Sequence, residues 1–277
     1  MNFQNYSEET LCVNLGCGDT FIKSKNWLNF DFKKKQDIIK SNLLKKIPLK
    51  SNYADIVYCS HFLEHIPEKK VQAFLIECGR ILKNKGILRL VLPDFKKMVE
   101  EYLFQRNSAN NKKSNFMMTS IIDQFVRTEP GGKLQKIFEE AEENNDQELK
   151  EYIYQRTGYD FKNSNIKNLD LLKNNSLLEK IKNNIFKKYC ILISNFLPKI
   201  FKDQNLSFAD IGEKHTWIYD KYLLEQLLHS SGFKNVREVT ESYSMMKNFP
   251  YKDLDVNEDN VPKKGFDSIF IEAVKDN

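Results

Sequence analysis

The residues best suited to chemistry near the start of the chain are two glycines and an aspartate. An apolar run over residues 11–15 ends at Gly16 and Gly18, where a backbone without Cβ can bend tightly and approach a ligand closely. A second apolar run over residues 27–30 ends on the carboxylate of Asp31. A carboxylate that closes the second strand of an α/β sheet can accept hydrogen bonds from both hydroxyls of a ribose. The spacing therefore predicts that the glycine bend and Asp31 converge on one nucleotide-like molecule.

The link from Gly18 to Trp27 is shorter than a full crossover helix, which usually takes a dozen or more residues. Either the first helix is reduced to a turn or the second strand begins later than residue 27. A dinucleotide site would place a third glycine at the start of a helix, but position 21 is Phe and no helical pattern follows. Nicotinamide dinucleotide binding is therefore the weaker interpretation.

A second polar group follows the apolar run over residues 54–59. Ser60 and His61 come directly after this run, with Glu64 and His65 a few residues further on. An imidazole with a pKa near neutrality can accept the proton of a hydroxyl, so His61 is our first candidate for a general base. For Glu64 and His65 we expect a structural role in fixing the backbone ahead of a helix.

Asp94 follows another apolar run, over residues 86–92, and has two open interpretations. It caps the helix expected after it, a common use of aspartate, or it serves as a second catalytic or acceptor-binding group. His215 lies ahead of a later helix and either packs there or faces the acceptor, whereas Trp217 and Tyr219 are expected to pack.

The elements that must position these residues alternate between strand-like and helix-like segments, as in a parallel α/β sheet with right-handed crossovers. A helix is expected from Pro67, ended by Asn84 and Gly86, and another over residues 220–231. The strands are expected over residues 11–15, 27–32, 37–39, 54–59, 86–92, 233–239 and 269–274.

Residues 96–208 break this alternation and are predicted to be a helical insertion or lid, with the core formed by residues 1–95 and 209–277. Four helices are expected in it, separated by asparagine- and lysine-rich tracts, over residues 98–104, 134–142, 148–154 and 177–201. Within it, residues 187–202 are apolar with basic flanks. Packing is the default interpretation of this stretch, and contact with a membrane surface is the alternative.

Bulk composition excludes several classes of protein. The chain of 277 residues is 41% hydrophobic, carries a net charge of +5 and contains five cysteines without a Cys-x-x-Cys pair. We expect a reduced, cytoplasmic protein with no signal peptide, no transmembrane segment and no metal-ligand cluster. The scattered lysines and the lack of a basic aromatic stripe argue against nucleic acid as a partner.

Taken together, several short segments resemble the class I S-adenosylmethionine-dependent methyltransferases, particularly small bacterial ones associated with polysaccharide biosynthesis. The resemblance covers roughly residues 11–95 and 213–275 and leaves out the insertion. Its main segments are Val13-Asn-Leu-Gly-Cys-Gly18, Trp27-Leu-Asn-Phe-Asp31, residues 51–65 (including Phe62-Leu-Glu-His65), residues 80–86, Leu92-Pro-Asp94, His215-Thr-Trp-Ile-Tyr-Asp220 and Ser231-Gly-Phe233.

This resemblance implies an α/β, Rossmann-like, seven-stranded and mostly parallel sheet with an antiparallel last strand. It also implies that S-adenosyl-L-methionine is the cofactor. By matching position, Gly16, Cys17 and Gly18 would approach its amino acid part, and Asp31 would hold its ribose. The other implied contacts are the adenine for Asn42 and Leu43, the sulfonium for Ser60 and His61, and a polar contact for Asn14, where many relatives carry an acid.

The function predicted from the sequence is therefore methyl transfer to a small molecule or glycan, with a hydroxyl oxygen as the expected acceptor. Two alternatives stay open. One is a scaffold protein that binds the cofactor or a nucleotide without catalysis, suggested by Asn14 and by Asn42, which replaces a common aspartate. The other is a nucleic-acid methyltransferase, which lacks support because no Asn-Pro-Pro-Tyr-type motif is present.

Overall fold

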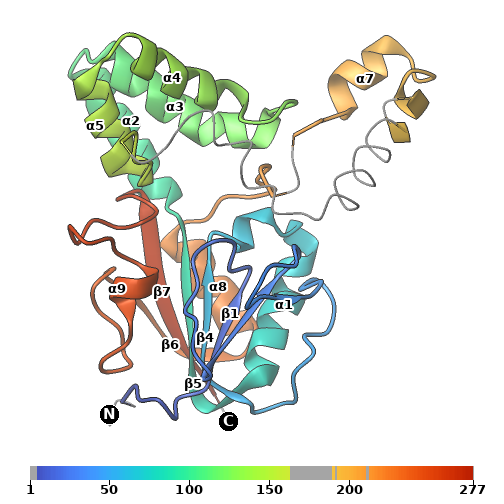
Figure 1. The fold of residues 1–277 in the computed structure, drawn as a ribbon, viewed down its shortest axis with the longest axis vertical. Helices are drawn as coiled ribbons and strands as arrows, with labels where there is room; N and C mark the ends of the chain where they lie inside the picture. The colour runs from blue at the N-terminus through green and yellow to red at the C-terminus, as the bar shows by residue number, and fades with distance from the viewer. Residues whose placement is uncertain (1–4, 163–188, 191, 210–211, 277) are drawn as a thin grey trace.

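The computed structural model of the chain describes residues 5–162, 189–190, 192–209 and 212–276. Their centre is one seven-stranded sheet in the order β3-β2-β1-β4-β5-β7-β6 (Figure 1). The first five strands are parallel neighbours, whereas β7 runs antiparallel to both β5 and β6. This Rossmann-like sheet with an antiparallel last strand confirms the predicted fold class. The strands are β1 (Cys12–Leu15), β2 (Trp27–Asp31), β3 (Ile39–Lys40), β4 (Ala54–Ser60), β5 (Leu82–Pro93), β6 (Phe233–Val239) and β7 (Ser268–Lys275).

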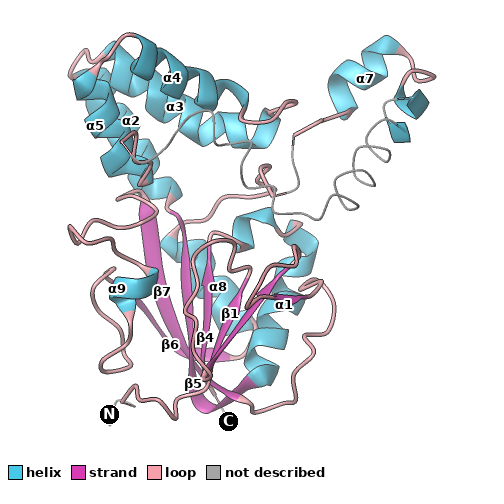
Figure 2. Ribbon diagram, viewed as in Figure 1, coloured by secondary structure: helices cyan, strands magenta, loops and turns pink. Residues whose placement is uncertain are grey.

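Two helices, α1 (Glu68–Ile81) and α8 (Lys221–Ser230), cover the same face of the sheet (Figure 2). The buried positions of α1 recur three and four residues apart, so that one apolar stripe faces the strands. In α8, Leu224 and Leu228 bury into the same core. The apolar core under these helices thereby connects β6 and β7 to the strands that carry the glycine bend and His61.

The opposite face is covered by irregular segments rather than by crossover helices. The short helix α9 (Tyr251–Leu254) and the loop before it, with Met245 and Phe249, pack on Trp27 and Tyr58. The connection from β1 to β2 contains no helix, although the two strands pair in parallel. Of the two alternatives that the short link left open, the structure has the reduced first crossover, and β2 begins at Trp27.

The end of α1 differs from the prediction. The helix ends at Ile81, and β5 begins directly at Leu82, so Asn84 and Gly86 lie within β5 rather than ending the helix. The pairing of β5 with β4 shifts from Ala54↔Leu82 to Ile56↔Ile87, which places residues 83–86 in a bulge. The polar, glycine-containing sequence there was interpreted as a helix terminator, but it forms an irregularity inside a strand.

The insertion begins with α2 (Phe95–Asn107), which follows β5 directly at the carboxyl-end edge of the sheet. Three further helices, α3 (Asn111–Val126), α4 (Gly132–Glu143) and α5 (Gln147–Thr157), pack with it around a separate apolar cluster (Figure 1). The sequence did not predict α3, because the asparagine- and lysine-rich tract at its start was interpreted as a separator. Asn110 caps that helix by accepting a hydrogen bond from the Lys113 N–H.

The last helix expected in the insertion, over residues 177–201, lies mainly outside the described residues. The described part contains α7 (Lys199–Asn205). None of the helices in the described part of the chain has the length and apolar character needed to span a bilayer.

A buried charge network fixes the helix-poor face of the sheet. Arg89 on β5 is fully buried and forms ion pairs with Asp255 at 2.9 Å and Glu272 at 2.8 Å. The hydroxyl of Tyr58 donates a hydrogen bond to Asp255 Oδ1 at 2.7 Å. Because buried charges are tolerated only when paired and hydrogen-bonded, the network ties β4, β5 and β7 to the segment around α9.

Candidate functional site

The glycine bend and Asp31 meet at the carboxyl ends of β1 and β2. Gly16 and Gly18 have φ angles of +70° and +54°, in the left-handed region that glycine adopts without a Cβ penalty. The N–H of Gly18 donates a hydrogen bond to Asp31 Oδ2 at 3.0 Å. The predicted convergence of the bend and the carboxylate is therefore present in the structure.

The two glycines serve different purposes. A Cβ atom on Gly16 would lie 2.5 Å from ring atoms of Phe62, so the absence of a side chain there lets the protein pack on itself. A Cβ atom on Gly18 would meet no atom within 4 Å. Gly18 is therefore the position where the bend faces open space and a ligand can approach the backbone.

A cavity of about 110 Å³ opens beside this bend. Its volume lies below the roughly 300–1,000 Å³ typical of sites that enclose a whole ligand. A cavity of this size can enclose only part of a cofactor-sized molecule. The cavity is lined by Asn14, Gly16, Cys17, Gly18, Asp19, Thr20, Tyr58, Ser60, His61 and Lys264.

Six of the predicted site residues therefore line one cavity, and two of them show how polar groups are arranged there. Asn14 is buried and donates from Nδ2 to the Thr20 carbonyl at 3.0 Å, while its Oδ1 has no partner among the described residues. That oxygen can accept a hydrogen bond from an ammonium or amide of a ligand. Burial is the main cause that raises the pKa of the Cys17 thiol to about 12, so Cys17 is a neutral wall residue.

Four other predicted residues do not line the cavity, although one of them, Asp31, is hydrogen-bonded to Gly18 beside it. Leu43 is buried in the core beneath the α1 face. Asn42 uses its Oδ1 to accept a hydrogen bond from the Leu44 N–H at 3.1 Å, which stabilises a turn. Asp94 caps α2 by accepting from the Lys96 N–H at 3.0 Å. The geometry of Asp94 is therefore that of a helix cap, the first of its two interpretations.

His61 occupies a strained and central position. Its φ of +47° is uncommon for a residue with a side chain and is typical of sites where the surroundings impose the backbone conformation. Its Nε2 lies 3.2 Å from the Ser268 hydroxyl, and its Nδ1 lies 3.3 Å from Glu64 Oε1. Burial, followed by the nearby charge of Lys264, holds the pKa of His61 well below its usual value. The imidazole is therefore neutral at neutral pH, the form that a general base requires.

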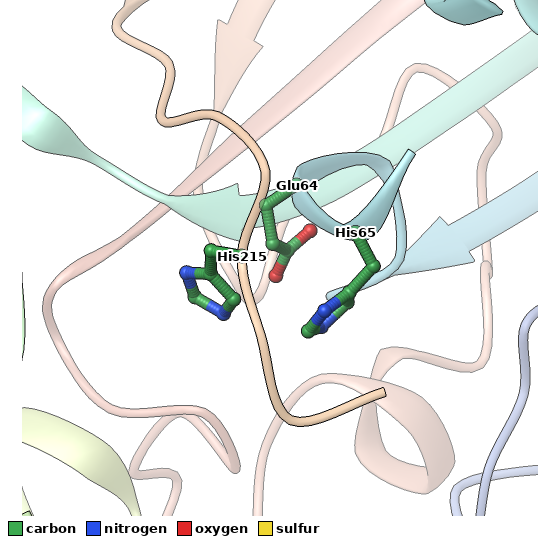
Figure 3. Close-up of side chains that lie close together, drawn as sticks. All are labelled: Glu64, His65 and His215. Atoms are coloured by element: carbon green, nitrogen blue, oxygen red, sulfur yellow. The ribbon is translucent and has the colours of Figure 1, made fainter. Parts of the chain in front are cut away.

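Glu64, His65 and His215 form a second cluster next to His61, which the sequence did not predict. Figure 3 shows the carboxylate of Glu64 pointing into the space between the two imidazole rings. Burial raises the pKa of Glu64 to about 8 and lowers that of His215 to about 3. Glu64 and His65 are adjacent in the sequence, but the approach of His215 could not be predicted, because it lies about 150 positions further along the chain.

Four cavity residues were also missed. Asp19 and Thr20 directly follow the glycine bend, so their proximity was available from the sequence. Tyr58 lies on β4 two residues before Ser60 and points to the same face, as the two-residue period of a strand requires. Lys264 lies in the loop before β7 and carries no local signal of its role.

Comparison with known proteins supports a methyltransferase-type domain in the first half of the chain. Residues 15–90 match the family model described as a methyltransferase domain. An uncharacterized protein of Methanocaldococcus jannaschii is 33% identical over 114 residues, covering 37% of this chain and 48% of the relative. The chain thus spans about half the length of that curated relative.

Two solved structures are similar at a lower level. A SAM-dependent methyltransferase from Thermotoga maritima is 11% identical, with a TM-score of 0.39, and the match covers 96% of this chain and 82% of that one. A SAM-dependent methyltransferase from Archaeoglobus fulgidus is 13% identical, also with a TM-score of 0.39, with 97% and 87% covered. The fold is shown by the strand order of the sheet.

The matched segment contains Gly16, Gly18, Ser60 and His61, which line the cavity, and Asp31, which is hydrogen-bonded to Gly18. The cofactor that such a domain implies is S-adenosylmethionine. The unpartnered Asn14 Oδ1 and the open side of Gly18 fit its ammonium-bearing end. Residues 15–90 of this chain are thus similar to a methyltransferase domain, and they contribute the first strands of a Rossmann-like sheet.

Proposed function

We propose that this protein transfers the methyl group of S-adenosylmethionine to a hydroxyl oxygen of a small molecule or glycan. The observation that carries the proposal is the meeting of Gly18 and Asp31 at a cavity that continues to Ser60 and His61. When bound, the cofactor supplies a methyl group already activated on a positively charged sulfur. The protein then has to orient the acceptor and exclude water, and such positioning is worth about 7–11 kcal/mol in favourable cases.

The cofactor-holding residues of the proposal differ in what they offer. Asp31 accepts the ribose hydroxyls, and the Gly18 backbone lets the ligand approach closely. The Oδ1 of Asn14 accepts a hydrogen bond from the ammonium group, and Cys17 forms a neutral wall. Asn42 and Leu43 support, from below, the surface on which the adenine would lie. Ser60 lies at the end of β4, on the side of the cavity nearest His61.

His61 is the proposed general base. Its imidazole is neutral and lines the cavity, and its Nε2 contacts the Ser268 hydroxyl, which holds the ring in a fixed orientation. Its lowered pKa makes it a weak proton acceptor, so its contribution is expected at the lower end of the 10²–10⁴-fold range for such catalysis. Asp94 is the second candidate, although its cap contacts occupy the carboxylate.

The insertion is proposed to select the acceptor. The backbone N–H of His215 donates to the Gln124 carbonyl of α3 at 3.0 Å, so α3 contacts the segment beside the site. A glycan acceptor rests on the resemblance to methyltransferases associated with polysaccharide biosynthesis. We expect a cytoplasmic protein. We also expect no nucleic-acid partner, because basic side chains are scattered along the sequence rather than gathered in a stripe.

Contact with a membrane surface through residues 187–202 is part of the same proposal. Of the described residues in this range, Leu192, Phe196 and Ile200 are 58%, 85% and 70% exposed. An apolar group with lysines on either side suits the interface of an anionic bilayer, where lipid-linked glycans are found.

Calorimetry with S-adenosylhomocysteine and with NAD tests the cofactor assignment. We expect binding of the first only, lost in Asp31→Ala and retained in Asp259→Ala, an exposed aspartate away from the cavity. Unchanged affinity in Asp31→Ala would contradict the ribose contact. A panel of glycans and hydroxyl-bearing small molecules, assayed with radiolabelled cofactor, then tests transfer, and binding without transfer across the panel would favour the scaffold alternative.

A further inference from the structure

Three of the four histidines in the chain gather around one buried carboxylate. Glu64 and His65 belong to the short helix η1 (Leu63–His65), and His215 reaches them from the segment before α8. One ligand atom from each of these three residues lies within 4.8 Å of the others. The three side chains converge on a common space (Figure 3).

The carboxylate of Glu64 lacks the partners that a buried acid needs. The residue is 1% exposed, and neither Oε1 nor Oε2 has a hydrogen-bond partner among the described residues. The imidazole of His61 lies 3.3 Å from Oε1 but does not form a hydrogen bond with it. Burying a carboxyl group without hydrogen bonds is costly, so an acid left in this state between two imidazoles points to a ligand that its oxygens would bind.

The histidines are oriented as ligands. The Nδ1 of His65 contacts the Lys214 carbonyl at 2.9 Å, so Nδ1 carries the proton and Nε2 keeps a free lone pair. The ring of His215 packs edge-on against Phe125, with centroids 5.8 Å apart, and edge-on against His65 at 4.7 Å.

The backbone holds the two halves of the cluster together before any ligand arrives. The N–H of Thr216 donates to the Glu64 carbonyl at 2.7 Å. The hydroxyl of Thr216 contacts the carbonyls of Ile66 at 2.6 Å and Glu64 at 3.1 Å. Residues 214–217 are therefore fixed to η1, and the donor atoms need little reorganisation to meet.

We propose that Glu64, His65 and His215 bind a divalent transition-metal ion, with Zn²⁺ preferred over Mn²⁺ and both preferred over Mg²⁺. One carboxylate and two imidazoles form a donor set that suits zinc-type ions, and three protein ligands leave a coordination position for water or a substrate oxygen. Two donors about 2.0–2.2 Å from a shared ion are at most about 4.4 Å apart. The observed set, within 4.8 Å, closes with a small side-chain shift.

The location gives the ion a role in the proposed methyl transfer, and this consequence rests on that proposed function. Glu64 lies beside His61, which lines the cavity. A metal ion there would bind an acceptor hydroxyl as a Lewis acid and lower its pKa.

Metal titration of the full-length protein tests the site. Protein treated with EDTA and dialysed is titrated by calorimetry with ZnCl₂, MnCl₂ and MgCl₂, alongside Glu64→Gln, His65→Gln, His215→Gln and the control His229→Gln. His229 is the fourth histidine; it lies at the end of α8, and its Nδ1 contacts the Phe233 carbonyl. We expect about one Zn²⁺ per chain, at least a tenfold weaker affinity in each of the three cluster variants and unchanged affinity in His229→Gln.

Binding of Co²⁺ gives a second readout that does not depend on activity. The visible absorption of bound Co²⁺ should appear in the wild type and in His229→Gln and be lost in His215→Gln. Each variant is checked for folding by circular dichroism and for S-adenosylhomocysteine binding. Equal Zn²⁺ affinity in the wild type and in a folded Glu64→Gln/His215→Gln double variant would overturn the metal site, as would the absence of Zn²⁺ binding.

The metal site and the cofactor assignment are tested independently of each other. S-adenosylhomocysteine binding without Zn²⁺ binding would remove the metal site and leave the cofactor assignment intact. Zn²⁺ binding that depends on Glu64 and His215, without S-adenosylhomocysteine binding, would do the reverse.

Discussion

Gly18 and Asp31 are joined by a hydrogen bond of 3.0 Å from the glycine N–H to Oδ2 of the carboxylate. The second carboxylate oxygen, Oδ1, accepts from the Lys33 N–H at 2.9 Å. Both oxygens are thus oriented by backbone groups, and the carboxylate is fixed next to the bend that it is proposed to serve. Each oxygen keeps further lone pairs, which a ligand hydroxyl can use without breaking these bonds.

Alanine at the two glycines should separate packing from ligand binding. Gly16→Ala places a Cβ against the Phe62 ring in a left-handed conformation, and we expect a loss of about 2–4 kcal/mol in the free energy of unfolding. Gly18→Ala adds its Cβ to open space, so about 1–2 kcal/mol of backbone strain should be the only folding cost. Its S-adenosylhomocysteine affinity should nevertheless fall. Urea unfolding measures the loss of stability, and calorimetry measures the affinity for S-adenosylhomocysteine. An equal loss of stability in both variants would contradict the different roles of the two glycines.

Arg89 should be one of the most sensitive positions for stability. Arg89→Met leaves the buried Asp255 and Glu272 facing each other without a cation, which typically costs about 3–5 kcal/mol. Arg89→Lys keeps the charge but lacks the planar fork that serves both acids, so an intermediate loss is expected. Denaturant unfolding of the three proteins checks this order, and a Met variant as stable as the wild type would contradict it.

Asp267 should make stability depend on pH in the acidic range. Its carboxylate pairs with Arg156 of α5, but burial dominates and raises its pKa from the ordinary 3.8 to about 6. Between these values the folded protein holds more protons than the unfolded chain, so this contribution is complete below pH 3.8 and is lost as the pH rises through 6. The difference between the two pKa values corresponds to at most about 3 kcal/mol in the free energy of unfolding.

The comparison that isolates this group is with Asp267→Asn. Urea unfolding of both proteins at several values between pH 4.5 and 7 should show wild-type stability falling relative to the variant as the pH rises. A constant difference across this range would show that Asp267 has the same pKa in the folded and unfolded chain.

Two substitutions at Asp94 should distinguish the cap from a catalytic carboxylate. Asparagine caps helices as well as aspartate does, so Asp94→Asn should keep both the stability and the methyl-transfer rate. Asp94→Ala removes the acceptor for the Lys96 N–H and should cost about 1 kcal/mol of unfolding free energy. A large loss of rate in a stable Asp94→Asn variant would instead make the carboxylate part of the catalytic machinery.

The sequence allowed the sheet and the glycine bend to be predicted because their signals are local. Apolar runs of strand length, ending at Gly16 or at Asp31, depend on neighbours in the chain and appear where expected. The helix α3 was missed because Asn110 was interpreted as part of a linker, although asparagine is equally suited to begin a helix. The bulge at residues 83–86 was missed for a similar reason, since Gly86 suits a helix end and a strand irregularity alike.

The site was predictable only in part, because two of its residues come from segments far away in the chain. Asn14, Cys17 and Ser60 follow from their positions on strands that pair in parallel. Lys264 and His215 reach the site from the last quarter of the chain, and no periodicity relates them to residues 14–65. Their positions follow from how the insertion returns the chain to the sheet, which is a property of tertiary packing.

The hydrogen bonds of Thr216 to Glu64 and Ile66 also constrain the order in which the protein matures during synthesis. A growing polypeptide emerging from the ribosome contains the first five strands and all of the helical insertion before residue 216 exists. Any nascent chain shorter than this has Glu64 and His65 without the segment that completes their surroundings. The histidine cluster is therefore assembled late in translation, after the helical insertion has already been made.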